Sequence, residues 1–213
     1  MDLDKAYSVK TPEDSRRLYA EWASTYNETF IKANDYVYPR TIAQKFDELM
    51  PKSDLQTVVD IGCGTGAVGS YLANLRPNLK ITGFDISPEM LAEASKLKRI
   101  DGSPVYNDLI EVDLTAELPK NSFDAMISAG TFTHGHLGAE TFISLIALVR
   151  ANGWLVIGIN SKHFSSQGFG VALKNACDQG LITQAQFHNV QIYGPESPHY
   201  GDLATIAIFQ RLK

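Results

Sequence analysis

Residues 58–66 of this 213-residue chain read Val58-Val59-Asp60-Ile61-Gly62-Cys63-Gly64-Thr65-Gly66. The first half of this stretch is a short apolar run, which is typical of a buried strand. The three glycines that follow permit a tight turn and let a ligand reach the backbone without meeting a Cβ. Apolar residues at helical spacing come next, and the first N–H groups of a helix attract an anionic group. The stretch therefore predicts a strand, a ligand-binding turn and a helix.

Two carboxylates follow the next two predicted strands. Asp85 ends the strand at 80–85 and stands 85 − 64 = 21 residues after the central glycine, and Asp113 follows a strand within 105–114. The carboxyl ends of parallel strands share one edge, where an acid can accept hydrogen bonds from ribose hydroxyls. We therefore predict a nucleoside site at this edge. The alternative is that each acid is an ordinary solvated strand end.

Strands and helical patterns alternate through the middle of the chain. Five strands are predicted, at or within residues 57–61, 80–85, 105–114, 123–128 and 154–160. This alternation indicates parallel βαβ units in a doubly wound α/β sheet. Two further strands, 187–193 and 203–211, have no room for a helix between them. They should therefore pair as an antiparallel hairpin.

About fifty residues precede this pattern and have a helical character. Residues 11–14 combine a threonine cap, a proline and an acid three residues after the threonine, which is the arrangement of a helix start. Apolar residues spaced four apart from 18 to 30 favour one amphipathic helix, and a second is expected at 39–49. We predict a helical extension at 1–50 and the main domain at 51–213.

Composition and charge narrow the functional class. Lys plus Arg is 19 and Asp plus Glu is 24, so the net charge is 19 − 24 = −5, which argues against non-specific binding to nucleic acid. No basic, apolar leader is visible, and no apolar run approaches the ~20 residues that span a bilayer. Cys63 and Cys177 suggest neither a disulfide nor a metal site. We expect a cytoplasmic protein without a metal, a membrane anchor or a nucleic-acid partner.

The motifs resemble those of class I S-adenosylmethionine-dependent methyltransferases. Residues 58–66 are similar to the family's first motif, 83–91 to its acidic second-strand motif, and 113–124 to its adenine-binding and fourth-strand signature. The resemblance covers roughly residues 55–160 and implies a seven-stranded, mostly parallel Rossmann-like sheet with a C-terminal antiparallel hairpin. Residues 19–27 resemble the entry helix of members that act on small molecules, among them the Williams–Beuren region methyltransferase-like subgroup.

The resemblance also implies the cofactor and its contacts. The cofactor would be S-adenosyl-L-methionine, and the methyl group would pass to a small-molecule acceptor by in-line displacement. The glycines would wrap the methionine part beside Asp60, Asp85 would take the ribose and Asp113 the adenine edge. The implied contacts are Tyr26, Asp60, Gly62, Gly64, Gly66, Asp85, Ile86, Met90, Asp113 and Leu114.

The acceptor side follows no motif, so its candidates come from chemistry. Residues 128–136 lack the acid or asparagine followed by two prolines and an aromatic residue that amino-group methyltransferases of DNA use. His134 and His136 have a near-neutral reference pKa and are our candidate general bases. The alternative is that they orient a loop or face solvent. Because alignment and desolvation can carry methyl transfer, a base is optional.

Two other functions stay open on sequence alone. Residues 64–69 satisfy the G-x-G-x-x-G pattern of NAD(P)-dependent oxidoreductases, and Asp85 suits a ribose there too. Against that reading, Asp60 favours a cationic ligand over a pyrophosphate, and the terminal hairpin is foreign to the simplest dinucleotide fold. The other possibility is a non-catalytic domain that keeps this fold and binds a cofactor or a partner.

Overall fold

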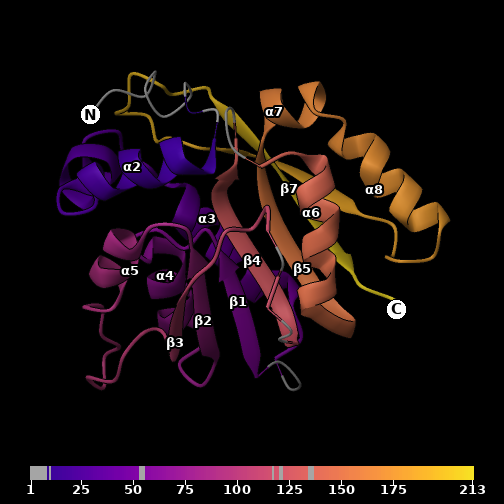
Figure 1. The fold of residues 1–213 in the computed structure, drawn as a ribbon, viewed down its shortest axis with the longest axis horizontal. Coiled ribbons are helices and arrows are strands. Elements are labelled where there is room, and N and C mark those ends of the chain that lie inside the picture. Colours follow the sequence, from indigo (N-terminus) through magenta and orange to yellow (C-terminus); the bar gives the residue numbers. More distant parts are fainter. Residues whose placement is uncertain (1–8, 10, 53–55, 117, 120–121, 134–136) are drawn as a thin grey trace.

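A seven-stranded sheet forms the centre of the computed structural model, which describes residues 9, 11–52, 56–116, 118–119, 122–133 and 137–213 (Figure 1). The strands are β1 (Thr57–Ile61), β2 (Lys80–Asp85), β3 (Asp108–Glu111), β4 (Phe123–Phe132), β5 (Val149–Asn160), β6 (Gln186–Gln191) and β7 (Leu203–Gln210). Their order is β3-β2-β1-β4-β5-β7-β6. The first five are parallel, and β7 lies antiparallel to both β5 and β6. The predicted sheet and its terminal hairpin are confirmed.

Helices cover both faces of the sheet (Figure 1). They are α2 (Pro12–Trp22), the π-helix η1 (Asn27–Lys32), α3 (Tyr38–Leu49), α4 (Ala67–Leu75), α5 (Pro88–Ala94), α6 (Ala139–Leu145), the 3₁₀-helix η2 (Ile146–Leu148), α7 (Ser161–Ser166) and α8 (Phe169–Asp178). One face packs against α3, α4 and α5, and the other against α6 and α8. Within the described residues, no helix is long and apolar enough to cross a bilayer.

Strand β1 is covered on both faces, and its one charged residue, Asp60, lies between Val59 and Ile61. Val58 joins the core beneath α3 and α4, whereas Val59 and Ile61 join the core beneath α6 and α8. All three side chains are fully buried. A parallel strand covered on both faces is mostly apolar, which is why apolar residues do not alternate with polar ones along it.

The helix predicted from residue 18 to residue 30 is interrupted. It begins as predicted, with Thr11 and Asp14 forming a reciprocal capping box, but α2 ends at Trp22 and the chain continues as η1. At the break the hydroxyl of Thr25 lies 3.4 Å from the carbonyl oxygen of Trp22. A threonine hydroxyl that bonds to a backbone carbonyl competes with the hydrogen bonds of a regular helix. The apolar residues therefore keep a spacing of four although the helix itself is interrupted.

The helix that precedes β5 is short. The α-helix ends at Leu145, one 3₁₀ turn follows, and β5 begins at Val149. Asn152 and Gly153 lie inside β5, and Asn152 has a φ of 63°. A Cβ on Gly153 would stand 2.6 Å from the carbonyl oxygen of Asp124. The glycine therefore permits an irregularity in the pairing of β5 with β4.

Helix α3 belongs to the main core, which Phe30 of η1 also joins, whereas residues of α2 line the cavity at the sheet edge. Ile42 and Phe46 of α3 are fully buried against α4. Buried Arg76, at the end of α4, holds the chain that leaves α3: its Nη2 lies 2.7 Å from the carbonyl oxygen of Met50, and its Nε lies 2.8 Å from Oδ1 of Asp47. The domain division at residue 50 stays a prediction.

Arg76→Met should lower the free energy of unfolding by about 3 kcal/mol, because buried carbonyl oxygens and a carboxylate lose their donor. Urea denaturation followed by circular dichroism measures the change. Arg17→Met is the control, because the Arg17 side chain is 73% exposed and its nearest contact to Asp14 is 3.5 Å. Equal stability losses in the two variants would contradict this role of Arg76.

Candidate active site

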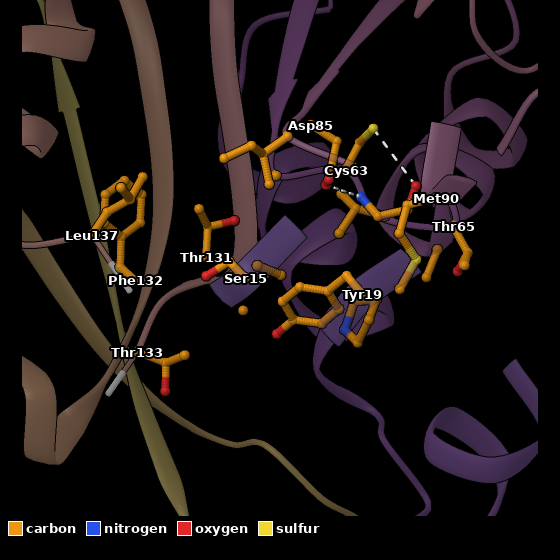
Figure 2. Close-up of a pocket in the computed structure, with 18 of the residues that line it drawn as sticks. Ser15, Tyr19, Cys63, Thr65, Asp85, Met90, Thr131, Phe132, Thr133 and Leu137 are labelled. Atoms are coloured by element: carbon orange, nitrogen blue, oxygen red, sulfur yellow. Dashed lines mark hydrogen bonds between the residues drawn. The ribbon is translucent and has the colours of Figure 1, made fainter. Parts of the chain in front are cut away.

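A cavity of about 310 Å³ opens at the carboxyl edge of the parallel strands. The glycine turn after β1, the ends of β2 and β4, and residues of α2 and η1 all line it. Figure 2 shows Asp85, Cys63 and Thr65 on one side of this space, and Thr131, Phe132, Thr133 and Leu137 on the other. The cavity therefore lies where an open α/β sheet ordinarily binds its ligand.

The glycine turn needs its glycines for different reasons. Gly62 and Gly64 both line the cavity with positive φ values of 64° and 53°. A Cβ on Gly62 would overlap the hydroxyl of Thr131, whereas a Cβ on Gly64 would meet nothing within 4 Å. Close packing thus restricts the first position, while backbone conformation alone restricts the second.

Asp85 connects this turn to the start of α5. Its Oδ2 accepts a hydrogen bond of 2.8 Å from the N–H of Gly64, and its Oδ1 accepts one of 2.9 Å from the N–H of Ser87 (Figure 2 shows the first). Burial raises the pKa of this carboxyl group, and the backbone donors oppose that rise. Each carboxylate oxygen can accept more than one hydrogen bond, so Asp85 keeps acceptor capacity toward the cavity that it lines.

Asp60 lies beneath the turn and does not line the cavity. It is fully buried, and its Oδ2 accepts a hydrogen bond of 2.7 Å from the Tyr106 hydroxyl. Its Oδ1 has no partner among the described residues. Burial is the main reason that its pKa rises to about 7. The structure thus places Asp60 behind the turn, within a buried pair.

Close packing around Tyr106 restricts Gly69, and it restricts Gly66 and Gly83 together with other side chains. A Cβ on Gly66 would stand 2.9 Å from the Tyr106 ring, one on Gly83 would stand 3.0 Å from it, and one on Gly69 would overlap the Tyr106 hydroxyl. Gly66 does not line the cavity, although it belongs to the predicted cofactor motif. Sequence reasoning missed Tyr106 because it lies in an irregular stretch before β3, outside every motif.

The remaining predicted cofactor residues come together at the cavity. Ile86, Met90, Asp113 and Leu114 all line it. Oδ1 of Asp113 accepts hydrogen bonds of 2.9 Å from the N–H of Thr115 and 2.6 Å from its hydroxyl. The loop after β3 is therefore held with the Asp113 carboxylate at the same edge as Asp85.

The N-terminal extension closes one side of the cavity. Tyr26 lines the cavity, and its ring stacks on Phe30 with centroids 4.9 Å apart. The hydroxyl of Thr65 lies 2.7 Å from Oδ1 of Asn27, which ties η1 to the glycine turn. Arg16 of α2 reaches the carbonyl oxygen of Ile86 at 3.3 Å. The extension thus contacts both loops that Asp85 joins.

The two candidate bases, His134 and His136, lie outside the described residues. Their described neighbours in the chain, Thr133 and Leu137, line the cavity. Cys63 also lines it, but burial raises the pKa of its thiol well above the usual value, which disfavours a nucleophilic thiolate.

Comparisons with known proteins agree with this geometry. Residues 59–155 match the family model described as a methyltransferase domain. A probable fatty acid methyltransferase of Pseudomonas putida is 27% identical over 161 residues, which are 72% of this chain and 40% of that protein. Trans-aconitate 2-methyltransferase of Streptomyces avermitilis is 33% identical over 86 residues, 39% of this chain and 32% of that protein. The chain thus spans two fifths or less of the length of these relatives.

Solved structures share the fold over nearly the whole chain. N-methyltransferase NodS of Bradyrhizobium japonicum, in complex with S-adenosyl-L-homocysteine, has a TM-score of 0.65 at 15% identity and covers 93% of this chain and 98% of its own. The plantazolicin methyltransferase BpumL has a TM-score of 0.59 at 15% identity, with 94% and 96% covered. The likeness to the Williams–Beuren subgroup stays a prediction. Residues 59–155 thus match a methyltransferase-domain model, and nearly the whole chain shares the fold of solved methyltransferases.

Proposed function

We propose that this chain transfers the methyl group of S-adenosyl-L-methionine to a small-molecule acceptor bound in the cavity. The observation that carries the proposal is the Asp85 carboxylate, which accepts the N–H of Gly64 and still lines the cavity. Bound S-adenosyl-L-methionine supplies a methyl carbon activated by a sulfonium, and the protein's residues bind, orient and desolvate the reactants.

The cofactor contacts divide by chemistry. Asp85 accepts the ribose hydroxyls, Asp113 accepts a proton of the adenine amino group, and Ile86 and Met90 pack against the adenine. The N–H of Leu114 is the neighbouring donor for a ring nitrogen. These assignments rest on residues that line one cavity.

The methionine end is proposed to lie at Gly62 and Gly64, with Tyr26 as its cover. Gly66 contributes to the shape of the turn, because its lack of a Cβ leaves room for the Tyr106 ring. Asp60 acts through charge: an ionised Asp60 stabilises a cation above the turn, and the cation in return lowers the pKa of Asp60. This preference distinguishes the site from one that binds a pyrophosphate.

The dinucleotide alternative is less well supported. The third glycine of its pattern, Gly69, stands where a Cβ would overlap the Tyr106 hydroxyl, so a packing need explains that glycine without a phosphate. A carboxylate beneath the turn also repels a pyrophosphate. A domain that binds the cofactor without turnover is distinguished by assay: a metabolite library incubated with S-adenosyl-L-methionine yields S-adenosyl-L-homocysteine only if the chain is an active enzyme.

Asp85→Asn should weaken S-adenosyl-L-homocysteine binding about 10- to 100-fold, because hydrogen bonds to a charged acceptor are worth about 1.5–3 kcal/mol. Isothermal titration calorimetry measures the dissociation constant. Asp108→Asn is the matched control, since Asp108 is an exposed aspartate at the start of β3, away from the cavity. Unchanged affinity in Asp85→Asn would refute the ribose assignment.

His134→Gln should lower turnover at least tenfold while the affinity for S-adenosyl-L-homocysteine stays within twofold, because general-base catalysis contributes about 10²–10⁴ where it operates. The rate is measured with the acceptor that the metabolite screen identifies, and His136→Gln is measured alongside. If both variants turn over at the wild-type rate, neither histidine is a base and the acceptor needs none.

Asp60 makes the stability of the unliganded protein depend on pH. Its pKa is raised from 3.8 to about 7, so the folded state binds this proton more tightly than the unfolded state does. The stabilisation is present below about pH 4 and is lost as pH rises to about 7. Asp60→Asn should flatten the fall in unfolding free energy over this window, as measured by urea denaturation at several pH values. An equally steep fall in the variant would show that other groups cause it.

A further inference from the structure

The acceptor side of the cavity is walled by aromatic and aliphatic side chains. Tyr36, before α3, and Tyr193, after β6, lie with ring centroids 5.6 Å apart, and both line the cavity with Ile192. Two backbone hydrogen bonds join the segments that carry them: Tyr38 N–H to the Ile192 carbonyl at 3.2 Å, and Gly194 N–H to the Asp35 carbonyl at 2.8 Å. The wall is therefore built from two segments far apart in the sequence.

The charged residues that line the cavity, among those that the structure describes, are all acidic. Of the described residues that line it, only Asp85 and Asp113 are charged, and the proposed function assigns both to the cofactor. No lysine, arginine or histidine is among those described lining residues. Apart from the sulfonium of the proposed cofactor, a carboxylate or phosphate that left water to bind there would find no cation among the described lining residues, which is costly. The lining therefore favours an uncharged acceptor.

The side-chain amide of Asn160, at the end of β5, can form a hydrogen bond with such an acceptor. Asn160 is 8% exposed and lines the cavity. Its Oδ1 accepts hydrogen bonds from the N–H groups of Lys162 at 3.0 Å and His163 at 3.3 Å, which caps α7. Because both partners are donors, the atom that faces them must be the oxygen, and this fixes which end of the amide is Nδ2.

The Nδ2 group of Asn160 has no hydrogen-bond partner among the described residues, and it is open to the cavity that the side chain lines. A donor that faces a cavity without a protein partner is available to an acceptor atom of a bound ligand. Asn160 follows Ile159, which pairs with Phe132 at the end of β4, so it lies at the same sheet edge as the proposed acceptor space.

We propose that Asn160 is a specificity-determining residue, and that the acceptor is an uncharged molecule with an aromatic body and an oxygen that accepts a hydrogen bond from Asn160 Nδ2. The aromatic body packs against Tyr36 and Tyr193, and the amide orients the oxygen-bearing end. This inference rests on the proposed function for the side of the cavity that the cofactor occupies.

Three probes of nearly one shape test the inference on protein saturated with S-adenosyl-L-homocysteine. They are 2-acetonaphthone, which carries a carbonyl oxygen, 2-isopropenylnaphthalene, which replaces that oxygen by carbon, and 2-naphthoate, which is an anion. Competition measured by saturation-transfer NMR gives their relative affinities. The ketone should bind about 3- to 10-fold more tightly than the hydrocarbon, which is the range of one neutral hydrogen bond, and the carboxylate should bind most weakly.

Asn160→Asp removes the Nδ2 donor and keeps the oxygen that caps α7, so the variant should fold and bind S-adenosyl-L-homocysteine as the wild type does. It should lose the preference for the ketone over the hydrocarbon. A second variant, Asn160→Ser, also keeps a capping oxygen and should lose the same preference without adding a charge.

Three results would overturn the inference: a ketone preference that persists in both variants, tightest binding by 2-naphthoate, or no binding by any naphthyl probe. The titration with S-adenosyl-L-homocysteine comes first and is independent of the probes. If that titration fails, the proposed function is wrong; if it succeeds and the probes fail, only the assignment of the acceptor is wrong.

Discussion

The contact on which the site depends is the hydrogen bond between the Asp85 carboxylate and the N–H of Gly64. It joins two turns that the chain separates by a helix and a strand, and the second carboxylate oxygen holds the start of α5 through Ser87. Each turn presents a backbone N–H at the sheet edge that the Asp85 carboxylate accepts. One buried acid satisfies both and still lines the cavity, so the same group that builds the site is available to a ligand.

A second buried acid supports the same turn from below. Asp60 and Tyr106 form a hydrogen-bonded pair in the core, and glycines at 66, 69 and 83 leave room for the tyrosine ring. A glycine-rich motif is usually interpreted as a ligand-binding turn, but in this chain side-chain packing requires some of its glycines. The distinction matters for function, because a pattern shared with dinucleotide-binding proteins is here partly explained by one aromatic side chain.

Much of the fold could be predicted because it follows from local periodicity. The apolar run of β1, the acid that ends β2 and the short gap before β7 each fix one feature of the sheet. The break after Trp22 could not be predicted, because the spacing of four continues through it while a threonine hydroxyl competes for the backbone. Tyr106 and Asn160 were missed for another reason. Tyr106 meets Asp60 only through the tertiary fold, and Asn160 looks like an ordinary strand end until its carbonyl oxygen is seen capping α7.

We propose that the turn at Gly62–Gly66 holds a sulfonium nucleoside beside Asp85. A crystal structure of the protein soaked with equal concentrations of S-adenosyl-L-methionine and NADH distinguishes the two ligands. We expect density for the sulfonium nucleoside, with both ribose hydroxyls within hydrogen-bonding distance of the Asp85 carboxylate. Density for the dinucleotide in that position, with its pyrophosphate on the turn, would refute this assignment.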